Sequence, residues 1–265
     1  MEIRQGGEDV PLGRRPVLAV VEHEVLLGRL RSLTTRGIFT DEICRCPGDL
    51  TLVLLDCDDF RIGVATLHPE SLAWEREIFR NDLVLGDQLA LRLLLANVGV
   101  NGAASGVLHS LISKLDLHEG EVQFRQAGDD EALAVRHVPP SLVQGLRPYS
   151  GEEAAQLDQG MVRGFKDRLL RAEGESRRAV RQLMAWLGSA TWPAEAVAGD
   201  GQLARRILGE FDPGLVMQAV REISEPREIM GAVAWAAFQS EDAAIMDAIG
   251  PQVTRMLAFH GPMGR

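Results

Sequence analysis

Three cysteines and one histidine in the first part of the chain could form a metal site. Cys44 and Cys46 are separated by one residue, and Cys57 and His68 follow at wider spacing. Thiolate sulfurs and imidazole nitrogens are ligands that tetrahedral zinc prefers, provided that short loops bring them together. Structural zinc sites usually carry cysteine pairs with about two to four residues between them, and the pattern here differs. We therefore expect reduced thiols and no metal or cofactor, with these four residues as the alternative.

Two aspartates form a second candidate set. Asp56 and Asp58 follow an apolar run, and paired carboxylates at the end of a strand can hold Mg²⁺, which prefers oxygen ligands. The pattern resembles the first motif of haloacid-dehalogenase-type phosphotransferases, which implies Asp56 as nucleophile and Asp58 as acid or base. If the protein is an enzyme, His68 joins this catalytic set. Phe60 stands where that family has a small residue, and a second apolar run follows at once, so a hairpin turn is the preferred interpretation.

A cationic stretch near the middle of the chain could bind an acidic partner. Between residues 161 and 181, seven basic side chains stand against three acidic ones, whereas the whole chain has a net charge of −10. A protein partner, the acidic N-terminal part of the same chain and nucleic-acid contact through residues 163–181 remain open. Nucleic acid is not expected, because the acidic total repels a duplex. The candidate partner-binding residues are Arg163, Lys166, Arg171, Arg177, Arg178 and Arg181.

Short apolar runs predict a small antiparallel sheet in the N-terminal part. Residues 50–55 and 61–67 are rich in strand formers and flank an Asp-rich turn, which is typical of a β-hairpin. Residues 71–74 predict a third short strand. The apolar residues of 17–33 recur with helical spacing, and residues 87–98 predict a helix that is apolar nearly all round and therefore buried.

The second half of the chain shows helical periodicity and no convincing strand. Residues 177–187 place apolar side chains at i, i+3, i+4 and i+7, and Trp186 near their end is expected in the core, with a partner anchor as the alternative. Asp212-Pro213 is a capping residue followed by proline at the first helical position. Ser240–Asp242 gives another start signal, and Gly250-Pro251 is expected to open the last helix.

These elements predict an α+β protein with two domains. Residues 1–15 are polar and glycine-rich and are expected to form a flexible leader. Residues 16–145 are expected to form a small α+β domain with a short antiparallel sheet. Residues 151–265 are expected to form an all-α helical bundle, and the boundary falls in the stretch rich in Pro, Gly and Ser between 139 and 151.

Two stretches resemble an unnamed family of uncharacterised proteins from high-GC bacteria. Val64–Trp74 followed by Asp82–Asp87 resembles a strand that ends in Leu-His-His-Gly and leads to Arg-Trp and a helix opened by Asp-Gly. Arg181–Ser189 resembles the helix end Ala-Trp-Phe-Gly-Ser-Gly of the same proteins. Pro69-Glu70 replaces the second His and the Gly, and Ala73 stands in place of the Arg. The resemblance implies the same domain order and no particular activity.

The composition of the chain indicates its cellular compartment and the kind of organism that encodes it. No apolar run approaches the roughly 18–20 residues that a membrane helix needs, no signal peptide is visible, and three cysteines suit a reducing compartment. Lys114 and Lys166 are the only lysines among 28 basic residues, a bias typical of a high-GC bacterial genome. The sequence therefore predicts a cytoplasmic bacterial protein that does not enter membranes.

The missing motifs decide the predicted function. The chain has no Walker A loop, no Gly-x-Gly-x-x-Gly, no His-Glu-x-x-His and no Gly-x-Ser-x-Gly. We expect a protein-binding or regulatory protein without catalysis, such as an adaptor, an immunity or antitoxin-like protein or an accessory subunit, whose partner is unknown. The first alternative is a metal-dependent phosphotransferase or hydrolase using Asp56 and Asp58, with an unknown substrate. The second is nucleic-acid contact through the Arg-rich helix.

Overall fold

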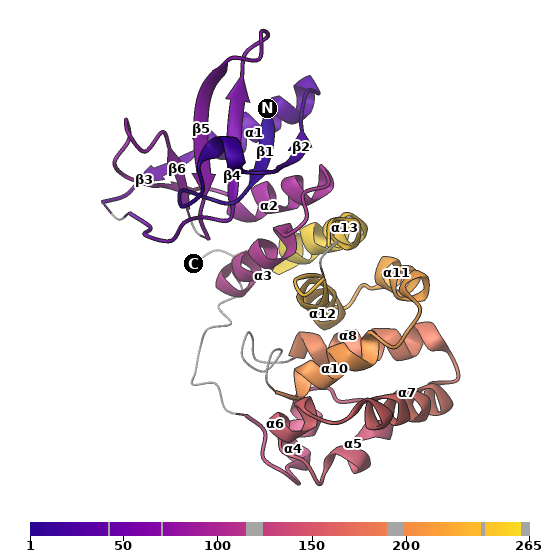
Figure 1. Ribbon diagram of the computed structural model, residues 1–265. Coiled ribbons are helices and arrows are strands. Elements are labelled where there is room, and N and C mark those ends of the chain that lie inside the picture. Colours follow the sequence, from indigo (N-terminus) through magenta and orange to yellow (C-terminus); the bar gives the residue numbers. More distant parts are fainter. Residues whose placement is uncertain (42, 70, 115–123, 190–198, 240–241, 261–265) are drawn as a thin grey trace. The chain divides into compact units, whose positions relative to one another are not determined.

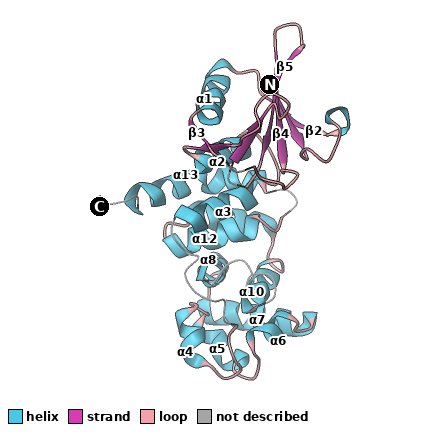
Figure 2. Cartoon of the chain, turned by 90° about the vertical axis from the view of Figure 1, so that its left-hand side faces the viewer, coloured by secondary structure: helices cyan, strands magenta, loops and turns pink. Residues whose placement is uncertain are grey.

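The computed structural model describes residues 1–41, 43–69, 71–114, 124–189, 199–239 and 242–260 (Figure 1). The chain divides into two compact units, which we call the sheet unit (Met1–Leu111 with Ser240–Ala244) and the helical unit (Ile112–Gln239 with Ile245–Arg265). Figure 2 shows strands in the sheet unit only. The predicted α+β class is confirmed. No helix in the described part of the chain combines the length and the apolar character needed to span a membrane.

The sheet unit is built on one antiparallel sheet. Its strands are β1 (Glu2–Gln5), β2 (Val17–Val20), β3 (Gly37–Phe39), β4 (Leu50–Leu55), β5 (Arg61–Leu67), β6 (Ser71–Trp74) and β7 (Leu83–Leu85). Their spatial order is β2-β1-β4-β5-β6-β7-β3, so β2 and β3 are the two edges. The predicted hairpin is confirmed as β4 and β5, and the predicted third strand is confirmed as β6.

Two N-terminal segments differ from their sequence-based predictions. Residues 1–15, expected as a flexible leader, contain β1, which pairs with both β2 and β4. Ile3 in β1 lies opposite Leu52 and has no exposed surface, so this segment belongs to the core of the sheet. The helix predicted over 17–33 is wrong for its first residues, which form β2, and the helix α1 begins later (Glu24–Thr35). Both β1 and β2 form because they pair with other strands, and the local spacing of apolar residues cannot predict such pairing.

One face of the sheet is covered by α1. Leu67, Leu72 and Leu83 are register partners on neighbouring strands and share this face, where all three are buried. Trp74 lies on the same face as Leu72, because side chains alternate along a strand. Its indole N–H donates to the carbonyl oxygen of Thr34 in α1 at 3.0 Å, which fixes the helix against the sheet.

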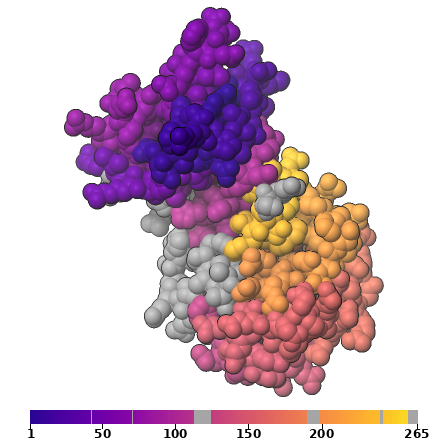
Figure 3. All heavy atoms as spheres, viewed as in Figure 1, coloured from indigo at the N-terminus to yellow at the C-terminus, as the bar shows by residue number. Residues whose placement is uncertain are grey.

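The other face of the sheet is covered by loops. Thr51, Thr66 and Ala73 are register partners on this open face. The N-terminal segment, with the 3-10 turn η1 (Leu12–Arg14), crosses over it, and the buried Arg15 donates to the Thr51 hydroxyl at 2.5 Å. Figures 1 and 3 show this indigo segment lying across the front of the sheet.

Helices α2 and α3 begin at carboxylate caps in the sheet unit. α2 (Gln88–Asn97) is capped by Asp87 and confirms the buried helix predicted over 87–98. α3 (Ala103–Lys114) begins where Asp242 accepts hydrogen bonds from two backbone amides at 2.7 and 2.8 Å. Asp242 was expected to help open a helix of its own. This prediction is confirmed, because α13 (Ala243–His260) begins at the next residue, and burial raises the pKa of the Asp242 carboxyl group.

The helical unit contains no strand among its described residues, as predicted. Its helices are α4 (Asp130–Val135), α5 (Pro140–Leu146), α6 (Gly151–Ala155), α7 (Gln159–Glu173), α8 (Ser176–Ser189), α10 (Asp200–Leu208), α11 (Pro213–Glu222), α12 (Pro226–Ala236) and α13 (Ala243–His260), of which α13 starts in the sheet unit. The units divide between residues 111 and 112, earlier than the boundary expected at 139–151. The predicted helix start at Gly250-Pro251 is wrong, because Pro251 lies inside α13.

Helices α8 and α12 pack backbone to backbone. A Cβ atom on Gly188 would lie 1.9 Å from the carbonyl oxygen of Arg227, and one on Gly231 would lie 1.8 Å from that of Met184. Only glycine permits such a close approach at both positions. Trp186 on α8 has no exposed surface, so its predicted place in the core is confirmed and the alternative of an exposed anchor is wrong.

Replacing Trp186 by Ala should lower the free energy of unfolding by about 3–5 kcal/mol, because it opens a large cavity in the core of the helical unit. Urea denaturation followed by circular dichroism measures this change. Val135→Ala in the same unit is the control, since Val135 is 69% exposed and its truncation should change stability by no more than about 0.5 kcal/mol. An unchanged midpoint for the Trp186 variant contradicts the core role.

Candidate metal centre

Three of the four predicted zinc ligands meet at one end of β5. The Sγ atoms of Cys44 and Cys46 and a ring nitrogen of His68 all lie within 4.8 Å of one another. Tetrahedral bonds of about 2.3 Å to sulfur and about 2.0 Å to nitrogen place such ligands about 3.5–3.8 Å apart. Shifts of about 1 Å would therefore bring these atoms around one ion. We call Cys44, Cys46 and His68 the thiol-imidazole cluster.

The orientation of His68 shows which nitrogen faces the thiols. Its Nδ1 lies 3.1 Å from the Sγ of Cys46. Its Nε2 is buried without a hydrogen-bond partner, and the nearest carboxylate oxygen in an ion pair is that of Glu8, at 3.9 Å. Metal-bound histidines commonly donate their second ring N–H to a carboxylate, which fixes the tautomer. Glu8 stands where such an acceptor is needed.

Near neutral pH the His68 imidazole is in its metal-binding form, whereas the Cys46 thiol is protonated. Burial lowers the pKa of His68 and outweighs the nearby carboxylates of Asp82 and Glu8, so its imidazole is neutral. Burial, aided by a hydrogen bond with the Cys44 thiol, raises the pKa of Cys46. The two thiols must release protons to a metal ion, so affinity should fall as the solution becomes acidic.

Asp82 holds the cysteine loop in place. Its buried carboxylate accepts a hydrogen bond from the Cys44 amide at 2.7 Å and one from the Ser71 hydroxyl at 3.2 Å. It also pairs with Arg76. Burial by itself would raise the pKa of Asp82, but the Cys44 hydrogen bond and Arg76 outweigh it and lower the pKa.

A buried guanidinium holds the histidine loop. Arg92 of α2 is 1% exposed and donates to the carbonyl oxygen of His68 at 3.0 Å. The same side chain pairs with Asp49, three residues after Cys46. One helix side chain therefore fixes both loops that carry the thiol-imidazole cluster.

Two glycines let the surrounding loops approach each other. Gly48 has φ +82°, and a Cβ there would lie 2.3 Å from the Thr66 side chain. A Cβ on Gly7 would lie 1.5 Å from the carbonyl oxygen of Pro47, which accepts the Glu8 amide at 2.7 Å. This hydrogen bond between the two loops places Glu8 beside the thiol-imidazole cluster. Sequence analysis missed both Glu8 and Asp82, because each approaches the cysteines only through loop contacts that no local motif signals.

The remaining candidate residues of the sheet unit lie elsewhere. Cys57 is exposed in the turn between β4 and β5, so it is not a fourth ligand of this cluster. Asp56 accepts hydrogen bonds from the amides of Asp58 and Phe60 at 2.9 and 2.8 Å, as expected of a hairpin turn. His68 follows the other end of β5. The structure does not bring Asp56, Asp58 and His68 together.

Most of the cationic candidates in the helical unit have partners within that unit. The ion pairs are Arg163–Glu210, Arg177–Glu222, Arg178–Glu173 and Arg181–Glu228. Lys166 donates to the carbonyl oxygen of Glu210. Arg171 is exposed and has no ion pair among the described residues. Intramolecular pairing therefore uses most of the charge that could attract a partner or a nucleic acid.

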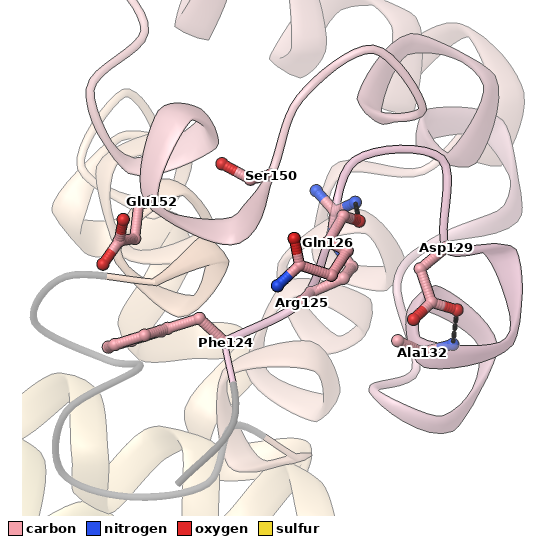
Figure 4. Close-up of a pocket in the computed structure, with 7 residues that line it drawn as sticks. All are labelled: Phe124, Arg125, Gln126, Asp129, Ala132, Ser150 and Glu152. Carbon is pink, nitrogen blue, oxygen red and sulfur yellow. Dashed lines mark hydrogen bonds between the residues drawn. The ribbon is translucent and has the colours of Figure 1, made fainter.

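The helical unit also contains a pocket of about 570 Å³ (Figure 4). Asp129 in its wall accepts the Ala132 amide as the cap of α4, and the Arg125 guanidinium donates to backbone carbonyl oxygens. Figure 4 shows Glu152 and Phe124 on the side opposite Asp129, so the polar groups do not converge on one point. The thiol-imidazole cluster is therefore the stronger candidate site.

No family model, curated protein or solved structure matches the chain. The resemblance to uncharacterised bacterial proteins stays a prediction. The chemistry of the cluster has to be inferred from its own residues.

Asp82→Asn should destabilise the sheet unit by about 1–3 kcal/mol, because Arg76 loses its buried acceptor. The folded-state pKa of Asp82 lies below its ordinary value of 3.8, so its charge stabilises the fold above pH 3.8 and this contribution is lost as the pH falls through the lower folded value. The difference between wild type and variant should therefore shrink in acid. Denaturation curves at neutral and acidic pH test this, with the exposed Asp58→Asn as control. A difference that is independent of pH would show that the carboxylate charge is not the cause.

Proposed function

We propose that the sheet unit is a metal-binding module that takes Zn²⁺ through the thiol-imidazole cluster. The convergence of two sulfur atoms and one imidazole nitrogen within 4.8 Å carries this proposal. Thiolate and imidazole ligands favour zinc over Mg²⁺ or Ca²⁺, which take oxygen ligands. The sequence alone led us to expect no metal, with a zinc site of four ligands as the alternative. The proposal adopts this zinc site but omits Cys57 from its ligands.

The electrostatics of the cluster support a divalent ion. Two thiolates and a neutral imidazole carry two negative charges, which Zn²⁺ neutralises. A neutral complex is the form least penalised by burial, since an unpaired charge in such a place costs several kcal/mol. Three protein ligands leave the fourth tetrahedral position for water or another small ligand. The Nε2–H of His68 would then donate to Glu8.

The proposed role of the ion is structural and regulatory. It would join the cysteine-bearing segment between β3 and β4 to His68, which follows β5. We therefore place the chain among protein-binding or regulatory proteins, in which metal occupancy sets the order of a surface. Reduced thiols as ligands agree with the bacterial cytoplasm as the proposed compartment.

Zinc should bind the purified protein at one ion per chain and raise its thermal midpoint. A ligand that binds only the folded state at 100 times its Kd adds about 2.7 kcal/mol of stability. Cys44→Ser, Cys46→Ser and His68→Gln should each remove most of this gain. Calorimetric titration and thermal melts with and without Zn²⁺ measure both effects.

Cys57→Ser is the matched control, because Cys57 is the exposed cysteine in the turn. It should bind zinc as tightly as the wild type. Replacing zinc by Co²⁺ adds a spectroscopic check, since thiolate-to-cobalt charge transfer should appear in the control and be lost in the cluster variants. Equal zinc binding by all four variants, or none by the wild type, refutes the metal centre.

A further inference from the structure

Strand β3 is an exposed edge of the sheet without charged residues. Its three residues, Gly37-Ile38-Phe39, pair on one side with β7. On either side of β3, the Arg36 carbonyl accepts from the Gly86 amide at 3.0 Å and the Thr40 amide donates to the Asp82 carbonyl at 3.1 Å. Because backbone groups alternate in direction along a strand, the N–H and C=O groups of Gly37 and Phe39 point away from the sheet. Natural edge strands normally carry a charge, a proline or a cover that prevents pairing.

Apolar side chains surround this edge. Ile38 is 75% exposed and lies opposite Val84 on the open face of the sheet. Phe39 is half exposed and stacks on Phe79 with ring centroids 6.0 Å apart. Ile78 is also exposed beside Phe79. Clustered apolar exposure of this kind marks a surface that binds another protein.

We infer that a second copy of this chain pairs with β3 in antiparallel orientation, across a twofold axis through Ile38. In this register Gly37 faces Phe39 of the partner subunit, and Ile38 faces Ile38 of the partner subunit. A twofold axis perpendicular to the sheet keeps each side chain on its own face, so both pairs are allowed. Four backbone hydrogen bonds form, because each outward-directed group of Gly37 and Phe39 gains a partner.

The sequence of β3 complements itself in this register. Gly37 adds no side chain to the pair with Phe39 of the partner subunit, and its own side-chain position is already filled, since a Cβ there would lie 2.1 Å from the carbonyl oxygen of Val84. On the open face, Val84 and Ile38 of each copy form one continuous apolar row. An isologous contact of this kind closes as a dimer.

The opposite edge of the sheet does not offer the same fit. β2 follows Pro16, which has no N–H to donate, and proline on an edge strand opposes pairing. Pairing of β2 with β3 would also be heterologous and would produce open chains of molecules. The β3 edge is therefore the one that favours a closed pair.

Sedimentation equilibrium over a wide range of protein concentration tests the inference. The wild type should form a reversible dimer, and Ile38→Lys should weaken dimerisation by at least about tenfold, because two lysines meet across the axis. Val20→Lys on edge strand β2 is the matched control, since Val20 is 57% exposed, and it should dimerise as the wild type does. A wild type that stays monomeric at all concentrations overturns the inference, and so does an unaltered dimer of Ile38→Lys.

Cross-linking tests the register. In a Cys57→Ser background with zinc present, Ile38→Cys should form an intermolecular disulfide under mild oxidation, because the two thiols face each other across the axis. Val20→Cys is the control and should cross-link far less. Equal cross-linking of the two variants refutes the register, whatever the outcome of the zinc measurements.

Discussion

Loops cover one face of the sheet, and the polar groups that they bury must all find partners. A helix satisfies its own backbone, but a loop cannot, and an unpaired buried group costs about as much as a lost hydrogen bond. In the sheet unit, three charged side chains provide hydrogen bonds to these loops. Asp82 holds the loop at Cys44, Arg92 holds the loops at Asp49 and His68, and Arg15 holds the N-terminal segment on Thr51. The thiol-imidazole cluster lies where these anchored loops meet, so its geometry follows from the same requirement.

A metal ion in this setting would add to an existing scaffold. The backbones that carry Cys44 and His68 are already hydrogen-bonded to Asp82 and Arg92, so little ordering remains to be done when the ion binds. Binding energy that is not spent on ordering loops appears as affinity. Glu8 differs from these anchors, because its carboxylate is partly exposed and shared with Arg76. It can move towards His68 without leaving a buried charge behind.

The sequence predicted the elements whose signals are local. The β4–β5 hairpin follows from two runs of strand formers around Asp56, and α11 follows from the cap at Asp212. β1, β3 and β7 have three or four residues each and exist only through pairing with distant strands, so periodicity could not reveal them. The sequence predicted the ligands of the thiol-imidazole cluster in part. Cys44, Cys46 and His68 are visible as ligand types, but their convergence depends on the fold, which also separates Cys57 from them.

The charged side chains of the two units differ in their surroundings, and this difference supports the proposal that the metal site lies in the sheet unit. In the helical unit, Asp200 lies buried between Arg125 and Arg136, and the arginines of α7 and α8 pair with glutamates on neighbouring elements. Such pairs neutralise much of one another's charge. In the sheet unit, the buried Nε2 atom of His68 without a hydrogen bond belongs to a ring that also faces two thiols, and the β3 edge exposes apolar side chains. Buried unsatisfied groups and uncovered apolar edges both cost free energy, and natural proteins tolerate them mainly where a ligand or a partner removes the cost.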